Sequence, residues 1–375
     1  EDPVGTFNPA MVEFWDNFIA MAEAQGLYLL LTPYDTFWQS INWDSYPYHT
    51  SGVCEEQGDW LTDRECIEAQ KNRWRFVIRR WGGSPNIFAW DLMNEIDLGA
   101  GATPDLVDAY VTEMAAFVRD LEMEYWGRTH MITVSAGAAL PTGAMGRVIY
   151  QHPALDFATT HLYIGTAIRA PRDTVTAGPT MAGGVIQSLD AIEDNRPYFD
   201  SESGPIDDWI EDAVFDTEYH HNMSWGHLAA GGAGSGMRWP YTNPHYILPG
   251  MRDNLLGLAR FAATIDWATF ESRNVNIQVH ASPRDAIPAA ITDGQLAVIW
   301  LLLDTRRDDA TFDGMTLTLN DVLEDGAYTV EFWETYEGEI IETMDASASG
   351  GVMEFALPDF DMPLKDVALI IRPQS

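Results

Sequence analysis

Short, uninterrupted apolar runs alternate along the first two thirds of the chain with longer segments whose apolar residues recur every three or four positions. The short runs predict strands that are covered on both faces, and the longer period predicts helices. Strands that alternate with helices are typical of βαβ units and a parallel sheet. The pattern therefore predicts an α/β domain over residues 1–268, with strands at 27–31, 87–93, 131–135, 157–161, 198–202 and 234–239.

The first helix has clear boundaries in the sequence. Asn8 suits the N-cap and Gly26 suits the exit. A second helix is expected after Thr62, which can form a capping box with Glu65. Helical spacing gives the first helix one face that we expect to be buried, made of Met11, Phe14, Trp15, Phe18 and Ala22.

After about residue 270 the pattern changes to short strand-like runs separated by turn residues. Tyr328, Val330 and Phe332 alternate with other side chains, which is the period of a half-buried strand. No long helical pattern intervenes. Residues 269–375 are therefore expected to form a separate antiparallel β-sandwich, with strands at 275–279, 296–303, 315–319, 328–333 and 367–371.

The composition is strongly acidic, with 57 Asp and Glu against 21 Lys and Arg and a formal net charge of −36. Such a surface repels nucleic acid and anionic membranes, and it suits a neutral or cationic substrate. In roughly 1 M salt the Debye length falls to about 3 Å, which screens most of the self-repulsion. Two interpretations follow: a salt-adapted protein, or an ordinary acidic secreted enzyme.

The sequence contains no apolar stretch long enough to span a bilayer. No secretory signal is visible at Glu1, as would also be true of a processed, secreted chain. Cys54 and Cys66 flank a loop-like segment. They either form a disulfide that braces this loop or remain as two free thiols, and two cysteines alone cannot make a zinc site.

Two glutamates each close a strand-like run and open a loop. Glu95 follows the run 87–93, and Glu202 ends the run 198–202. In a parallel α/β barrel, side chains at the C-terminal ends of different strands converge on one site. Two carboxylates at such a site are the minimum machinery for cleaving a glycosidic bond.

Four segments in the correct order carry a family resemblance. Residues 89–95 resemble the fourth-strand signature of clan A glycoside hydrolases, particularly family 5. Residues 160–163 resemble the sixth strand of that clan, 197–204 the seventh and 236–239 the eighth. The resemblance implies a (β/α)8 TIM barrel, with a small C-terminal β-domain like those seen in the clan.

By this resemblance the protein is a retaining β-glycoside hydrolase that cleaves a neutral β-linked polysaccharide or oligosaccharide of mannan or glucan type. Glu95 would be the general acid/base and Glu202 the nucleophile, with Tyr163 as a hydrogen-bond donor to Glu202. Asn94 would bind the sugar hydroxyl next to the anomeric carbon, and Trp239 would form the stacking floor. No cofactor and no metal are expected, and the expected partner is a carbohydrate substrate, with no nucleic acid and no membrane.

Other candidate substrate contacts are less specific. His161 is either a core histidine packed beneath the site or a ligand-binding one. Aromatic residues crowd the loop after the run 27–31, where they can stack on sugars or pack the loop itself; they are Trp38, Trp43, Tyr46, Tyr48 and Trp60. Trp209 and Tyr241 follow the seventh and eighth strands and are further candidates.

The sequence departs from the family pattern in three ways. Ile96 stands where the family often has proline, and Ser203 replaces a frequent aromatic residue. Counting back from Glu95, the run 27–31 would be the third strand, so the barrel is expected to lack its first two strands in this chain. Either the chain is a fragment or the barrel is built differently; we favour a fragment, because the missing strands would leave an unpaired edge and exposed apolar surface.

Two other functions compete with hydrolysis by paired carboxylates. The chain could be a carbohydrate-binding remnant of a barrel, which presents aromatic side chains but does not cleave. A metal-dependent barrel hydrolase would need a His-x-His pair on an early strand, and the sequence offers none.

Overall fold

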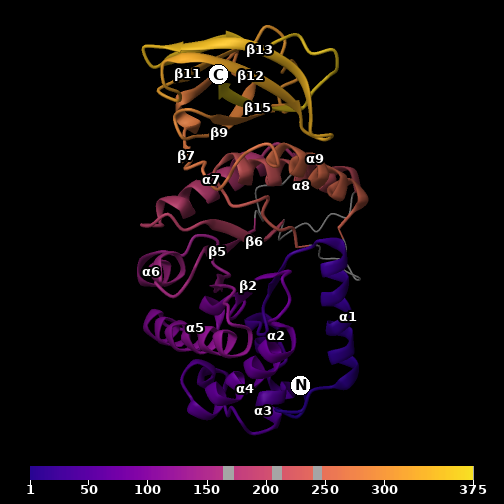
Figure 1. The fold of residues 1–375 in the computed structure, drawn as a ribbon, viewed down its shortest axis with the longest axis vertical. Coiled ribbons are helices and arrows are strands. Elements are labelled where there is room, and N and C mark those ends of the chain that lie inside the picture. Colours follow the sequence, from indigo (N-terminus) through magenta and orange to yellow (C-terminus); the bar gives the residue numbers. More distant parts are fainter. Residues whose placement is uncertain (164–172, 205–212, 240–246, 375) are drawn as a thin grey trace. The chain divides into compact units, whose positions relative to one another are not determined.

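The computed structural model describes residues 1–163, 173–204, 213–239 and 247–374. The chain divides into two compact units. The first consists of Glu1–His161 and Ala191–Tyr198, and the second of Leu162–Asp190 and Phe199–Ser375. The β-domain predicted from residue 269 onward therefore lies in the second unit, together with helices that precede it in the chain (Figure 1).

Parallel strands alternate with helices from residue 29 to residue 204. Strands β1, β2 and β3 hydrogen-bond in that order, and both pairs are parallel. A single residue separates β3 from β4. Strand β4 pairs in parallel with β5, and β6 completes the order β4-β5-β6. The predicted α/β fold is thus confirmed, with strands β1 (Leu29–Leu31), β2 (Ile87–Asp91), β3 (Met131–Thr133), β4 (Ser135–Ala136), β5 (Ala158–Tyr163) and β6 (Tyr198–Gly204).

Capping residues fix several helix ends of the first unit. Asn8 accepts a hydrogen bond from the Ala10 N–H at 2.9 Å, and Gly26 ends that helix in the left-handed region at φ 67°. The capping box expected at Thr62 is wrong, because the carboxylate of Asp63 accepts the N–H groups of two first-turn residues instead. The described α-helices here are α1 (Pro9–Gln25), α2 (Thr36–Ile41), α3 (Pro47–Thr50), α4 (Arg64–Trp81), α5 (Pro104–Trp126) and α6 (Gly143–Gln151).

The apolar face expected on the first helix is only partly buried. Ile19 and Ala22 of α1 are buried, but Met11 is 52% exposed and Phe14 is 54% exposed. The ring of Trp15 lies 6.2 Å from that of Trp81 on α4, so the helix packs along one side and leaves the rest of its apolar stripe uncovered. The prediction that the whole stripe is buried is wrong, because the stripe is wider than the surface it contacts.

Strand β1 lies at an edge. Among the described strands it pairs with β2 alone, and its three residues are half-buried. The two residues before it, Leu27 and Tyr28, are 59% and 69% exposed. The expectation that this run is covered on both faces is therefore wrong for the described chain.

The C-terminal part of the second unit is an antiparallel β-domain, as predicted. Hydrogen bonds join all nine of its described strands into one sheet, in the order β7-β9-β10-β15-β12-β13-β14-β11-β8. Strands β8 and β9 lie near opposite ends of this order but follow each other in the chain, so the sheet curls round. Its strands are β7 (Arg273–Asn274), β8 (Val279–Ser282), β9 (Ala286–Thr292), β10 (Ala297–Leu303), β11 (Thr316–Asn320), β12 (Gly326–Glu334), β13 (Glu339–Ser349), β14 (Val352–Ala356) and β15 (Asp366–Pro373).

The curled sheet encloses a single apolar core. Side chains of β8 through β15 meet in it, among them Ile299, Val330 and Leu369. A sandwich of two sheets was the expectation; the structure achieves the same enclosure with one continuous sheet. The expected strand at 275–279 is mostly a short 3-10 helix (Asn276–Gln278), and strand β8 begins only at its last residue.

Three helices of the second unit, α7 (Ala177–Asp190), α8 (Ala213–Ala229) and α9 (Pro249–Ala262), pack beside this sheet (Figure 1). Trp300 of β10 lies against α7, where a Cβ on Gly178 would come within 2.7 Å of its ring. The Trp300 indole donates to Asp366 at 2.7 Å, and Asp366 also bonds His221 of α8 at 2.9 Å. Both faces of β10 are thereby buried, which accounts for its continuous apolar sequence.

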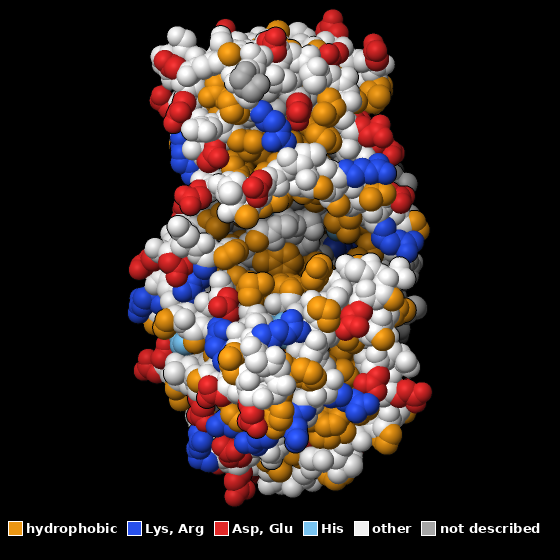
Figure 2. Space-filling view, in the orientation of Figure 1, with side chains coloured by type: hydrophobic (Ala, Val, Ile, Leu, Met, Phe, Trp, Pro, Cys, Tyr) orange, Lys and Arg blue, Asp and Glu red, His pale blue; other side chains and the backbone are white. Residues whose placement is uncertain are grey.

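Three further features bear on the sequence predictions. Cys54 and Cys66 form a disulfide, and both residues are buried. Figure 2 shows Asp and Glu side chains scattered over the visible face of the molecule, in keeping with the net charge of −36. Among the described residues, no helix combines the length and the apolar character that a membrane crossing requires.

Candidate active site

The predicted site residues lie in both units. Glu95 follows β2 in the first unit, and its backbone is in the left-handed region at φ 52°. Its N–H donates to the hydroxyl of Ser135 on β4 at 3.0 Å, and that hydroxyl donates to Asp91 at 2.7 Å. Asp91 is buried, and burial raises the pKa of its carboxyl to about 6. Hydrogen bonds between residues of β2 and β4 therefore fix the backbone from which the Glu95 side chain projects.

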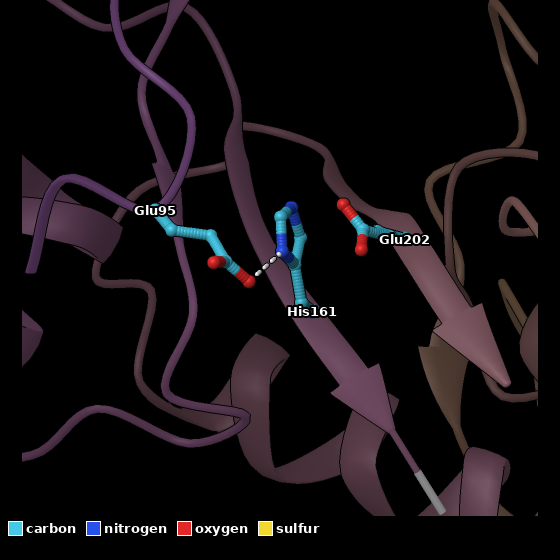
Figure 3. Close-up of side chains that lie close together, drawn as sticks. All are labelled: Glu95, His161 and Glu202. Carbon is cyan, nitrogen blue, oxygen red and sulfur yellow. Dashed lines mark hydrogen bonds and ion pairs between the residues drawn. The ribbon is translucent and has the colours of Figure 1, made fainter. Parts of the chain in front are cut away.

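The Glu95 carboxyl is held by a histidine. Its Oε1 lies 2.8 Å from Nδ1 of His161, which projects from β5 and is buried (Figure 3). The sequence left two roles open for His161, core packing or ligand binding. The structure adds a third, since this buried ring contacts the candidate acid/base directly. A carboxylate and an imidazole are also metal ligands, but here the two groups are hydrogen-bonded to each other.

A glycine leaves room for this arrangement. A Cβ on Gly137 would lie 3.0 Å from the carboxyl carbon of Glu95 and 2.4 Å from Cδ1 of Leu98. Asp97 accepts the N–H groups of Gly137 and Ala138 at 2.7 and 3.0 Å. The loop after β4 is thus held close beside Glu95. Any larger side chain at position 137 would collide with the side chains of Leu98 and Glu95.

Asn94 is anchored by a residue that the sequence analysis did not identify. Its Nδ2 donates to Oδ2 of Asp35 at 2.7 Å. Thr36 adds a side-chain hydrogen bond to the carbonyl of Asn94 at 3.0 Å. A signal was present in the sequence, because Asp35 follows the run 27–31 much as Glu95 follows the run 87–93.

In the second unit, Glu202 lies in β6 and accepts a hydrogen bond from the hydroxyl of Tyr163 at the end of β5. Figure 3 shows the Glu202 side chain projecting from its strand. The hydroxyl of a neutral tyrosine donates to a carboxylate and stabilises its charge. The predicted donor to Glu202 is therefore in contact with it.

Trp239 lies beside the same strand. Its backbone N–H donates to the carbonyl of Ser203 at 2.8 Å, and the Ser203 hydroxyl donates to the carbonyl of Met237 at 2.7 Å. The segment 237–239 thus runs along β6, with a parallel bridge between Ser203 and Arg238. Ser203, one of the departures from the family pattern, fastens the segment that carries Trp239.

A buried histidine, His227, forms hydrogen bonds that hold β6 and the residues before Trp239 together. Nε2 of His227 on α8 accepts the Asp200 N–H at 3.1 Å, and Nδ1 donates to the carbonyl of Gly234 at 2.9 Å. Burial lowers the pKa of His227 to about 4, so the ring is neutral at pH 7. His227 thereby joins β6 to the turn that leads into Trp239.

The predicted aromatic contacts have different surroundings. Trp38 on α2 is 55% exposed, and Trp43 is half-buried and stacks on Tyr46 with ring centroids 6.0 Å apart. Tyr48 and Trp60 are buried and pack the loop itself. Trp209 and Tyr241 lie outside the residues that the structure describes.

Several curated relatives of the chain carry the name of mannanases. A probable mannan endo-1,4-beta-mannosidase F of Aspergillus flavus is 25% identical over 156 residues, which are 40% of this chain and 33% of that protein. Mannan endo-1,4-beta-mannosidase 4 of Oryza sativa subsp. japonica is 30% identical over 188 residues, 42% of this chain and 39% of that protein. The matches thus span well under half the length of these relatives. No family model matches the chain.

Solved structures extend the similarity to nearly the whole chain. A glycoside hydrolase family 5 protein from Bacteroides vulgatus superposes with a TM-score of 0.59 at 14% identity, covering 96% of this chain and 74% of that one. A structure described as a glycoside hydrolase gives 0.58 at 15% identity, with coverage of 96% and 77%. At such identity the likeness defines the fold, here an α/β fold with a C-terminal β-domain.

The relatives and the fold agree with the family resemblance of the sequence, although the strand predicted at 234–239 is wrong: that segment makes only an isolated bridge at Arg238. The chain resembles clan A glycoside hydrolases, and family 5 in particular.

Proposed function

We propose that this chain carries the catalytic carboxylates of a retaining β-glycoside hydrolase that acts on a β-mannan. One observation carries the proposal: two glutamates at the ends of parallel strands have distinct hydrogen-bond partners, His161 for Glu95 and Tyr163 for Glu202. Different partners suit different roles in a double displacement. The mannanase names of the curated relatives favour mannan over glucan.

In the proposed reaction, Glu202 attacks the anomeric carbon while Glu95 gives a proton to the departing glycosidic oxygen. Water, activated by Glu95 as base, then cleaves the glycosyl ester and restores Glu202. This outcome requires carboxyl groups about 5–5.5 Å apart. The Tyr163 hydroxyl stabilises the negative charge of Glu202 before attack, and His161 orients the carboxyl of Glu95. Asn94 binds the hydroxyl beside the anomeric carbon, and Trp239 stacks on the sugar.

The proposal extends to the architecture. The parallel strands belong to a (β/α)8 barrel, of which β1 is the third strand, and the β-domain begins near residue 269. The parallel pairing of β1, β2 and β3, and of β4 with β5, supports this architecture. We propose a secreted enzyme whose partner is carbohydrate, with Trp38 and Trp43 as outer sugar contacts.

The experiment is hydrolysis of aryl β-mannosides and mannan by carboxylate variants. Glu202→Ala is expected to lower turnover by about 10⁴-fold or more on every substrate. Glu95→Ala is expected to cost about 10²- to 10⁴-fold with poor leaving groups and much less with a dinitrophenolate, which needs no proton. Glu271→Ala removes an exposed carboxylate and is the control. Full activity of both site variants would rule the mechanism out.

A carbohydrate-binding remnant is the second candidate, and the exposed ring of Trp38 favours it. Calorimetry with manno-oligosaccharides distinguishes the two. Heat of binding that Trp38→Ala removes, with no product released over a long incubation, selects binding without cleavage. Product release that Glu202→Ala abolishes selects the hydrolase.

A further inference from the structure

Asp35 uses both of its carboxylate oxygens on neighbouring groups. Oδ1 accepts the N–H of Trp38 at 2.7 Å and so caps α2, and Oδ2 accepts Nδ2 of Asn94 at 2.7 Å. The backbones of Asp35 and Asn94 also form a parallel bridge. The N–H of Asn94 donates to the carbonyl of Tyr34 at 2.9 Å. Asp35 is therefore held in place by the backbone, and each of its oxygens already accepts one hydrogen bond.

A carboxylate determines which way the Asn94 amide faces. It accepts hydrogen bonds and cannot donate them when ionised, so the NH2 group of Asn94, and not its oxygen, lies against Asp35. The other polar neighbour, the Ser135 hydroxyl, is 3.3 Å from Oδ1 of Asn94 but only 2.7 Å from Asp91. Because a hydroxyl has one hydrogen, Ser135 is a weak partner for the amide. Asp35 is the group that removes the alternative, flipped orientation.

Fixing this amide has a chemical consequence. With one N–H on Asp35, the second N–H and the oxygen of Asn94 are directed away from that carboxylate. Asn94 precedes Glu95 directly in the chain, and Ser135 contacts both residues: its hydroxyl lies 3.3 Å from Oδ1 of Asn94 and accepts the backbone N–H of Glu95 at 3.0 Å. A hydroxyl on the sugar can both donate and accept, and it would meet a donor and an acceptor in a fixed order.

We propose that Asp35 is the positioning residue that orients the Asn94 amide toward the sugar hydroxyl beside the anomeric carbon. The proposal rests on the proposed hydrolase function, and Asp35 itself does not contact substrate. Burial raises the pKa of Asp35, while its bonds to Trp38 and Asn94 act against that shift. The two hydrogen bonds therefore help to keep a partly buried carboxylate ionised, which the orienting role requires.

The test separates the cap on α2 from the contact with Asn94. Asp35→Ser keeps a good N-cap but is too short to reach Asn94, whereas Asp35→Asn keeps the size and an acceptor oxygen. The substrates are an aryl β-mannoside and its 2-deoxy counterpart, which lacks the hydroxyl in question. Asp44→Ser, an exposed aspartate of the same loop, is the control.

Asp35→Ser is expected to lower kcat/KM on the full mannoside by about ten- to a hundred-fold, mainly through kcat. On the 2-deoxy substrate its effect is expected to be less than about three-fold, because the oriented group has nothing to bind there. Asn94→Ala should show the same selectivity, and adding Asp35→Ser to it should cost nothing more. Asp35→Asn should recover part of the loss.

Equal losses on both substrates would overturn the inference and leave Asp35 a purely structural residue, and so would unchanged rates on both. A wild-type chain that cleaves neither substrate would contradict the hydrolase instead. In that case the side-chain amide signals of Asn94, identified by their loss in Asn94→Ala, still decide the point. One of the two protons should be shifted and slow to exchange in the wild type but not in Asp35→Ser; identical signals would overturn the orientation.

Discussion

Two continuous apolar runs of this chain have opposite surroundings. The run 297–303 forms β10, whose every residue is buried between an apolar core on one face and the helices of the second unit on the other. The run 27–31 leads into β1, whose residues are half-buried and which pairs along one edge. Similar sequence patterns thus gave a central strand in one unit and an exposed edge in the other.

The difference teaches what an apolar run does and does not specify. It makes burial favourable, at about 25 cal/mol for each Å² of apolar surface removed from water, but it does not supply the surface that does the burying. The β-domain supplies its own cover, because its sheet curls and its helices lie beside it. The N-terminal unit leaves Met11, Phe14 and Tyr28 largely in solvent.

The largest expected effect concerns the buried strand β10. Trp300→Ala should destabilise the protein by about 3–5 kcal/mol, because it removes a fully buried indole and leaves Asp366 without one of its donors. Phe14→Ala in the exposed stripe should change the unfolding free energy by less than about 0.5 kcal/mol. Urea unfolding measures both. A loss of similar size in the two variants would mean that α1 is covered in solution.

Removal of the disulfide should act on the first unit alone, since both cysteines lie there. The double variant Cys54→Ser, Cys66→Ser is expected to lose about 3 kcal/mol through the greater entropy of the unfolded chain. Hydrogen exchange should become faster in the loop between α2 and α4, whereas the amides of β10 keep their protection. Faster exchange in β10 as well would show that the two units unfold together.

Two buried groups, one in each unit, should respond to acid in opposite directions. The folded-state pKa of His227 is about 4, below its usual 6.5, so the unfolded chain binds the extra proton first and stability falls as pH drops from about 6.5 to 4. The pKa of Asp91 is raised to about 6 from 3.8, so the folded chain binds that proton first and stability rises over about pH 6 to 4.

Each of these shifts corresponds to about 3 kcal/mol. His227→Gln should therefore flatten the acid-induced loss of stability, and Asp91→Asn should steepen it. Unfolding free energies from pH 7 to 4 provide the measurement. Profiles that stay parallel to the wild type would exclude either group as the source of the slope.

The smallest expected effect concerns the exposed face. Replacing Met11 and Phe14 by glutamine should change stability by less than about 0.5 kcal/mol but reduce binding of a hydrophobic dye and self-association in high salt, where charge repulsion is screened. Sedimentation velocity at low and high salt follows the association. Unchanged dye binding and association would mean that the exposed face of α1 is not the surface that binds the dye or drives self-association.

Local signals in the sequence determined several helix ends and the position of Glu95 at the end of a strand. Asn8 and Gly26 delimit α1 because caps act within one turn, and the motif at 89–95 put Glu95 at the end of a strand. Strands β9, β13 and β14 were not predicted. For β13 the reason is that the strand is mostly exposed and lacks an apolar alternation. Its partner β12 defines it through hydrogen bonds between backbones, which leave no mark on side-chain composition.

Tertiary structure alone decided the contacts that shape the site. His161 was a candidate without a definite role until the fold brought its ring to the Glu95 carboxyl, 66 residues away in the chain. The position of Asp35 after a strand-like run marks it as a candidate, but its partner Asn94 lies 59 residues away and no local pattern identifies it. Periodicity records which face of an element is apolar, since that depends on neighbours one turn or one pleat away. Which distant group meets that face depends on the path of the whole chain.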